Sequence, residues 1–223
     1  MAEDVAVEKK ETKSGTAFNL DEMMEAGLHF GHKTSKTHPK MQPYIAGIRN
    51  TIHIINLEKT SEKLQEALEV MKEFIAGGKT ILLVGTKVQV KNLVKETAEA
   101  CGLPYVSGRW IGGLLTNFDT VSKRIEYLKE LEEKTKSEEF GKYTKKEQHD
   151  MADEIRILEI KFGGVKNLSQ LPHALFVVDL DKNGLAVREA KRKGIGTIAI
   201  ADTNTDPTSV DYAIPANDDA VSS

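Results

Sequence analysis

The sequence predicts an α/β protein with a doubly wound parallel sheet of about five strands and an inserted helical hairpin. Short apolar runs alternate with helical patterns, and the run 80–84 has no polar face. A strand that is apolar on both faces is typical of a parallel sheet covered by helices on each side. One long charged stretch, 117–162, has a different periodicity and predicts the insertion.

The N-terminal fifth of the chain is predicted to form a tail, a short helix and an ordered loop or arm. Residues 1–17 are small and charged, so we expect a disordered tail. Asn19 or Asp21 can cap a short helix. Residues 29–50 are rich in glycine, proline and polar side chains, which favours an ordered loop or extended arm.

Alternating strands and helices follow the arm. Leucine, methionine and isoleucine at helical spacing predict a helix over 60–76 that ends at the glycine pair 77–78. Apolar, β-branched runs bounded by turn residues predict the strands. The remaining expected elements are strand 51–57, strand 80–84, helix 87–101, strand 105–106, strand 174–178, helix 183–193, strand 197–201 and strand 212–214.

The stretch 117–162 is expected to form an antiparallel helical coiled-coil hairpin. Its apolar residues alternate at spacings of four and three, which is a heptad seam. The seam positions are Val121, Ile125, Leu128, Met151, Ile155, Leu158 and Phe162. Gly141 lies between the two runs, where the chain can reverse. The hairpin would divide one globular α/β domain into 18–116 and 163–223, and its charged face would lie in solvent or against a partner.

Composition restricts the class of protein. Charged residues make up 29% of the 223 residues and hydrophobic ones 39%, which is typical of a globular protein with a well-solvated part. The single cysteine, Cys101, excludes an internal disulfide and is consistent with a reducing compartment. We expect its side chain to be packed in the core. No run approaches the ~20 apolar residues of a membrane span, and the N-terminus lacks the apolar centre of a secretion signal. We therefore expect a cytoplasmic protein.

Charge is segregated along the chain although the net charge is only −3. Residues 26–57 contain no acid, and neither do residues 74–95. No lysine or arginine follows Lys193, whereas five aspartates do. Such segregation predicts a positive face and a negative, acidic C-terminal face. The acid-free segments hold Lys33, Lys36, Lys40, Arg49, Lys79, Lys87, Lys91 and Lys95.

The stretch 105–120 contains the only tryptophan of the chain, Trp110, beside Arg109. An exposed pair of this kind suits nucleic acid, because the guanidinium binds phosphate and the indole can stack on a base. The alternative, which composition favours, is that Trp110 belongs to the core and the neighbouring glycines form turns.

Phosphate and catalytic motifs are incomplete. Gly78-Lys79-Thr80 and Gly194-Ile195-Gly196 resemble parts of nucleotide fingerprints, but both precede strands, whereas those motifs must follow one. Only Gly85-Thr86-Lys87 has the order strand, turn, helix, and it could hold a phosphate on free backbone amides. No nucleophile–base pattern accompanies it. A nucleotide- or sugar-phosphate-binding enzyme is therefore the alternative function, and no catalytic residue is predicted.

A metal site is a weaker hypothesis. The carboxyl ends of parallel strands are where doubly wound folds bind ligands, and histidine with carboxylate suits zinc. The candidate ligands are His29, His32, Asp179, Asp202 and Asp206. Because such spacings are common by chance, we predict no metal and no other cofactor.

Six ordered motifs together resemble one family. They are the stretch 26–60, ILLVGTK, YVSGRWIGGLLTNFDT, LPHALFVVDL, IAIADTNTDP and YAIPANDDA. Over about residues 20–220 the chain resembles the small-subunit ribosomal protein S2 family of bacterial type. The resemblance implies a flavodoxin-like domain with a protruding coiled coil and a non-enzymatic role in binding small-subunit rRNA. It also implies a role in anchoring the large mRNA-binding protein of that subunit.

Carried onto this sequence, the resemblance places His29, His32 and several basic residues in RNA-facing or loop-ordering positions. Together with Lys87 of the phosphate turn, the expected RNA-binding residues are Lys33, Lys36, Lys40, Arg49, Lys87, Arg109 and Trp110. Binding would be electrostatic, with shape rather than base sequence giving specificity. The acidic C-terminal face would then be free for a basic or helical protein. A third possibility is a coiled-coil scaffold that binds no RNA.

Overall fold

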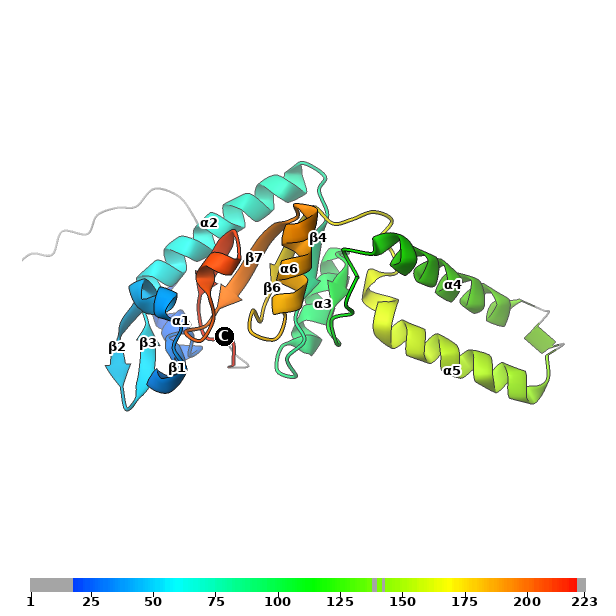
Figure 1. Cartoon of the computed structure of the whole chain (residues 1–223), viewed down its shortest axis with the longest axis horizontal. Coiled ribbons are helices and arrows are strands. Elements are labelled where there is room, and N and C mark those ends of the chain that lie inside the picture. Colours follow the sequence, from blue (N-terminus) through cyan, green and yellow to red (C-terminus); the bar gives the residue numbers. More distant parts are fainter. Residues whose placement is uncertain (1–17, 138–139, 142, 220–223) are drawn as a thin grey trace, which may run out of the picture.

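The computed structural model describes residues 18–137, 140–141 and 143–219. An α/β domain occupies most of its length, and a pair of helices projects from one end (Figure 1). The predicted tail, residues 1–17, lies outside the described residues. No helix among those described is long and apolar enough to cross a membrane.

The domain is built on a five-stranded parallel sheet with the order β5-β4-β6-β7-β8. In chain order this is 2-1-3-4-5, the flavodoxin-like arrangement of a doubly wound sheet. The predicted fold class is therefore confirmed. The five strands are β4 (Ile81–Val84), β5 (Tyr105–Val106), β6 (Ala174–Val177), β7 (Gly196–Ala201) and β8 (Tyr212–Pro215).

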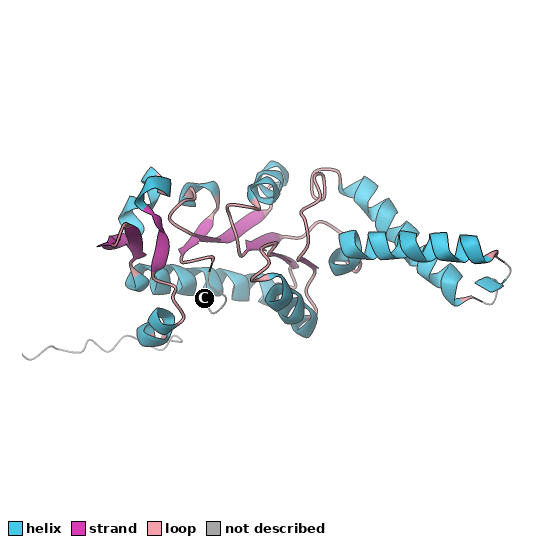
Figure 2. Cartoon of the chain, turned by 90° about the horizontal axis from the view of Figure 1, so that it is seen from below, coloured by secondary structure: helices cyan, strands magenta, loops and turns pink. Residues whose placement is uncertain are grey.

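Helices cover both faces of this sheet (Figure 2). Alternate residues of a strand point to opposite faces, and all four residues of β4 are buried. Ile81 and Leu83 pack in clusters with α2 (Leu57–Ala76) and α3 (Lys91–Cys101). Leu82 and Val84 belong to the cluster that contains α6 (Gly184–Lys193). The absence of a polar face in 80–84 is thus explained.

Capping residues set the helix bounds. The Asn56 side chain accepts hydrogen bonds from the amides of Glu58 and Lys59, so α2 begins three residues before the predicted Thr60. Helix α3 begins four residues after the predicted start at Lys87, because residues 87–90 form a turn. Cys101, the last residue of α3, is exposed, so its assignment to the core is wrong.

A second, antiparallel sheet is the main correction to the prediction. Strands β1 (Phe30–Lys33) and β2 (Ile45–Arg49) pair on either side of β3 (Ile52–Ile55). Residues 29–50 are therefore not an extended arm: they supply two strands joined by the 3-10 turns η1 (Thr34–Lys36) and η2 (Pro39–Tyr44). Their glycines and prolines masked the strand pattern. The short helix α1 (Leu20–Glu25) begins after Asn19, whose side chain caps it as predicted.

The projecting helices are α4 (Phe118–Lys136) and α5 (Lys145–Phe162), which run antiparallel and pack against each other (Figure 1). A capping box between Thr144 and Glu147 starts α5. The predicted seam is buried at Val121, Ile125, Leu128, Leu158 and Phe162, and Leu131 joins it. The helical hairpin is confirmed, while supercoiling of its helices and the domain bounds drawn from it stay predictions.

Candidate functional site

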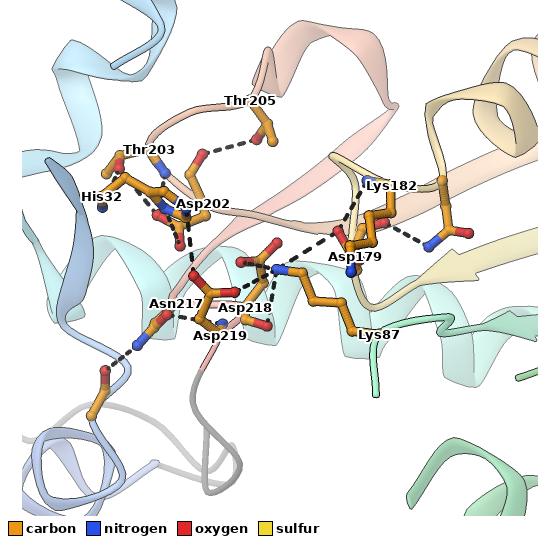
Figure 3. Close-up of polar contacts among 12 residues, drawn as sticks. His32, Lys87, Asp179, Lys182, Asp202, Thr203, Thr205, Asn217, Asp218 and Asp219 are labelled. Carbon is orange, nitrogen blue, oxygen red and sulfur yellow. Dashed lines mark hydrogen bonds and ion pairs between the residues drawn. The ribbon is translucent and has the colours of Figure 1, made fainter. Parts of the chain in front are cut away.

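The carboxyl edge of the parallel sheet is filled by the chain's own C-terminal segment. The ammonium of Lys87, which follows β4, donates hydrogen bonds to Asp218 Oδ1 at 2.7 Å and Asp219 Oδ1 at 2.8 Å (Figure 3). Asp179, which follows β6, lies 3.9 Å from the same nitrogen. Lys87 is only 6% exposed. The edge at which doubly wound folds bind ligands is thus closed by an internal ion-pair network.

Electrostatics hold this network together. Burial opposes the charge of Lys87, but its hydrogen bonds to Asp218 and Asp219 prevail and raise the pKa of the ammonium. The hydrogen bond from Lys87 holds the pKa of Asp219 below its ordinary value. Burial raises the pKa of Asp179, against hydrogen bonding from the Lys182 amide. The charge of Lys87 is therefore already balanced inside the protein.

This arrangement removes Lys87 from the expected RNA-binding residues. A buried ammonium with three carboxylates around it has no free hydrogens to offer a phosphate, and those carboxylates would repel one. The same geometry argues against a phosphate turn at Gly85-Thr86-Lys87, since the Thr86 hydroxyl also turns inward and lies 3.2 Å from Asn183 Oδ1.

His32, Asp202 and Asp219 form a cluster beside this network. His32 Nδ1 lies 3.0 Å from Asp202 Oδ2, and His32 Nε2 lies 3.5 Å from Asp219 Oδ2 (Figure 3). Burial raises the pKa of Asp202, while the Thr203 amide donates a hydrogen bond to its other oxygen. One imidazole nitrogen and two carboxylate oxygens within 4.8 Å of one another could hold a divalent cation such as zinc.

The predicted convergence of metal-ligand types is partly correct. His32 and Asp202 meet, but Asp219 completes the group and was not among the candidates. Asp179 instead belongs to the Lys87 network, and Asp206 pairs with Lys40. The sequence signal for Asp219 is the acidic pair Asp218-Asp219 shortly after the last strand, although the charge pattern predicts a surface position for it.

Trp110 is a core residue. It is 7% exposed, and its indole nitrogen donates to Glu189 Oε1 at 3.2 Å. The interpretation that composition favours, Trp110 in the core, is therefore confirmed. The alternative of an exposed Arg109-Trp110 pair is wrong for Trp110, because its buried ring is not free to stack on a base. Arg109 itself is exposed.

Glu189 of α6, which sequence reasoning missed, organises the loop after Trp110. Its carboxylate accepts hydrogen bonds from the amides of Gly113 at 2.8 Å, Leu115 at 3.1 Å and Thr116 at 3.2 Å. Burial disfavours its charge, but these donors and the indole prevail and lower its pKa. A charged residue inside a helical pattern carries no sequence signal for such a role.

The remaining predicted basic residues lie on or beside the antiparallel sheet. Lys33 of β1 and Arg49 of β2 both pair with Ile52 of β3, so they lie in one row across the sheet. With strands about 4.8 Å apart, their backbones are about 10 Å apart. Lys36 follows in η1. All three cations are exposed, and none has an ion-pair partner within the described part of the chain.

Lys40 differs from these three. Its ammonium donates to Asp206 Oδ2 at 2.8 Å and to the Thr208 hydroxyl at 2.7 Å. This contact lowers the pKa of Asp206, with the hydrogen bond from Lys40 as its largest cause. Lys40 is accordingly already paired with a carboxylate before any partner binds.

The prediction of an acidic C-terminal face is wrong for most of the five aspartates that follow Lys193. Asp202 and Asp218 are buried. Asp211 accepts hydrogen bonds from the amide and hydroxyl of Thr197, both at 2.8 Å. These aspartates are used to hold strands and turns in place, so they do not form a free negative surface.

The fold and its filled strand edge together define a doubly wound α/β protein whose usual ligand-binding edge is occupied by its own residues. Comparison with known proteins agrees. The family model described as ribosomal protein S2 matches residues 23–223. The chain is 46% identical over 210 residues to the small ribosomal subunit protein uS2 of Psychrobacter cryohalolentis, and equally to that of Psychrobacter arcticus. Each alignment covers 94% of this chain and 80% of the relative.

The chain therefore belongs to the ribosomal protein S2 family, which is structural and non-enzymatic. The family resemblance inferred from the six sequence motifs is confirmed.

Proposed function

We propose that this protein is a structural component of the small ribosomal subunit and binds rRNA through Lys33, Lys36 and Arg49, the arm surface. The observation that carries the proposal is that these three cations are exposed on or beside one small sheet without internal counter-ions among the described residues. The ribosomes of bacteria work in the cytoplasm, which is where we place the protein.

Counterion release gives the arm surface its affinity. Each cation that reaches an rRNA phosphate displaces condensed counterions, so binding weakens as salt rises. Unpaired cations contribute most to the binding free energy. A paired cation such as Lys40 must first break its ion pair with Asp206 before it can bind a phosphate.

The backbone near Arg49 is held in an uncommon conformation. Asn50 and Thr51 have φ values of 48° and 66°. A β-branched residue in the left-handed region is uncommon and strained. The Thr51 carbonyl accepts a hydrogen bond from the Thr34 amide at 3.0 Å, which ties the turn to η1 and Lys36. The tight turn keeps the cations of the arm surface in a fixed relative position, as recognition of RNA by shape requires.

The test is rRNA binding by a triple variant, Lys33→Ala, Lys36→Ala and Arg49→Ala. A matched control removes three exposed lysines elsewhere, by Lys72→Ala, Lys134→Ala and Lys193→Ala. We expect the arm variant to lose affinity for folded small-subunit rRNA much more than the control. Equal losses would reduce the proposal to a net-charge effect and contradict it.

We also propose that the hairpin helps to anchor the large mRNA-binding protein of the subunit. A groove of about 670 Å³ lies along the hairpin, and its apolar lining includes Ile111, Ile157 and Phe162. Ile157 is 49% exposed. An exposed apolar groove between charged walls suits an amphipathic segment of a partner. Ile157→Asp should reduce capture of that protein, while Ile75→Asp on α2 should not.

The alternative, a nucleotide- or sugar-phosphate-binding enzyme, is opposed by the neutralised Lys87. The purified protein distinguishes the two functions. RNA that co-purifies and is removed by high salt supports the ribosomal function. A stoichiometric small nucleotide would support the enzyme, and partner capture by the hairpin without any RNA would support a scaffold.

A further inference from the structure

A second basic site lies where the hairpin joins the domain. A polar pocket of about 390 Å³ is enclosed by the start of α3, the loop after β5 and the end of α5. We call it the junction pocket. Its basic lining residues are Lys91, Lys95, Arg109 and Lys161. None of the lysines among them was predicted to bind RNA.

The pocket has an excess of positive charge. Lys91, Arg109 and Lys161 are exposed, and none of these three makes an ion pair within the described ranges. Lys95 reaches only Glu99, at 3.9 Å. The single carboxylate in the lining is Glu159, which also lies 3.8 Å from Lys166. Three cations therefore face one pocket without a matching negative charge.

Helix stability does not explain the position of Lys91. It is the first residue of α3, a helix with no side-chain cap and no acidic residue in its first turn. A cation at that end opposes the helix dipole. The position suits an external negative charge, which would interact favourably with both Lys91 and the helix terminus.

The loop that carries Arg109 is anchored from inside the domain. The neighbouring Trp110 is buried, and its indole nitrogen donates a hydrogen bond to Glu189. This contact fixes the backbone on which Arg109 stands, while the guanidinium stays exposed. An Arg on a fixed backbone can bind two oxygens of a phosphate with its planar fork at little entropic cost.

We propose that the junction pocket binds the phosphodiester backbone of folded RNA, as a contact separate from the arm surface. The proposal rests on the ribosomal function proposed above. The cations come from three separate elements, so they match a row of phosphates rather than one enclosed anion. An RNA bound there would bridge α3 and α5 and so fix the hairpin against the domain.

The experiment measures the affinity of the full chain for folded small-subunit rRNA as a function of salt. The junction variant carries Lys91→Ala, Arg109→Ala and Lys161→Ala, and the control is again Lys72→Ala, Lys134→Ala and Lys193→Ala. Log affinity falls as log salt rises, and each lost phosphate contact makes this negative slope shallower by about 0.7 on single strands and about 0.9 on duplex, so the slope should become shallower by about 2 to 3. The single variant Lys161→Gln repeats the test if the triple variant unfolds.

The outcomes separate this inference from the proposed function. If the wild type and the arm variant behave as expected but the junction variant equals the control, the junction inference alone is overturned. If the wild type shows no salt-sensitive binding of rRNA, both the junction inference and the proposed function are overturned. Competition by a poly-glutamate peptide as strong as that by RNA would assign the pocket to an acidic protein and also overturn the inference. Inorganic phosphate alone should bind weakly, and saturation at low millimolar phosphate would indicate a free-anion site instead.

Discussion

Two regions of this molecule contain similar residues but use them in opposite ways. At the carboxyl edge of the parallel sheet, Lys87 is buried and its charge is balanced by carboxylates. On the antiparallel sheet, Lys33 and Arg49 are exposed and unpaired among the described residues. Burial and counter-ions, rather than residue type, decide whether a basic residue supports the fold or is free for a partner.

The comparison also explains why charge segregation along the chain is a poor guide to the surface. The acid-free stretches and the acidic C-terminal end are far apart in sequence, so they suggest two faces. Folding brings them together, and Asp218 and Asp206 pair with Lys87 and Lys40. Only cations that these aspartates do not reach remain available.

The largest effect is expected at the buried network. Lys87→Met leaves Asp179 and Asp218 buried without their cation. Breaking a buried ion pair in this way costs about 3–5 kcal/mol of the free energy of unfolding. Chemical denaturation should show that loss, while Lys33→Met on the exposed sheet should change stability by less than about 0.5 kcal/mol. Similar losses for both variants would remove the distinction between the two regions.

A second effect is expected at Glu189. Glu189→Gln removes the negative charge of this carboxylate. The carboxylate accepts hydrogen bonds from the amides of Gly113 and Leu115 and from the Trp110 indole. Hydrogen bonds to charged groups are each worth about 1.5–3 kcal/mol, so a loss of about 2–3 kcal/mol is expected. Because Trp110 is the only tryptophan, its fluorescence reports the same site. The emission should shift to the red, and an unchanged spectrum would mean that Glu189 does not position the indole.

The Glu189 effect should depend on pH. Its pKa in the folded state is lowered from 4.5. Its contribution to stability is therefore fully present above about pH 4.5, the unfolded value, and is lost as the pH falls through the lower folded pKa. Denaturation of the wild type and Glu189→Gln at several acidic pH values should show their difference shrinking. A difference that stays constant in acid would contradict this assignment.

The smallest effect distinguishes two neighbouring lysines. Lys40 is bonded to Asp206 and Thr208, whereas Lys36 is unpaired among the described residues. We expect Lys36→Ala to weaken rRNA binding more than Lys40→Ala, and Lys40→Ala to reduce stability by at most about 1 kcal/mol, as for an exposed ion pair. Filter binding and denaturation on the two variants measure both quantities. Equal weakening of rRNA binding would mean that the Asp206 contact opens freely.

The parallel sheet and the hairpin could be predicted because their signals are local. The apolar run 80–84 and the four-and-three spacing of residues such as Ile125 and Leu128 each follow from one element alone. The strands β1 and β2 could not be predicted, because each contains a glycine and the segment between them contains two prolines, which are usually found in loops. Their pairing with β3 is a tertiary contact.

The candidate site was predicted less well than the fold. The buried Trp110 finds its hydrogen-bond partner in Glu189, which is 79 residues away. In the sequence Lys87 resembles a phosphate-binding residue. In the structure its ammonium is bound by Asp218, which lies 131 residues later in the chain. Such contacts between distant residues have no periodicity that a sequence could show. The arm-surface residues Lys33, Lys36 and Arg49 were named from the sequence, and their contact with rRNA stays a prediction.

The salt dependence of rRNA binding tests the central claim most directly. The claim is that the exposed cations of the arm surface contact rRNA and that the buried Lys87 does not. For the variant Lys33→Ala, Lys36→Ala and Arg49→Ala, the negative slope of log affinity against log salt should become shallower by about 2 to 3 relative to the wild type. Lys87→Met, under conditions where it is folded, should keep the wild-type slope. A wild-type slope for the arm variant, with a reduced slope for folded Lys87→Met, would contradict the account.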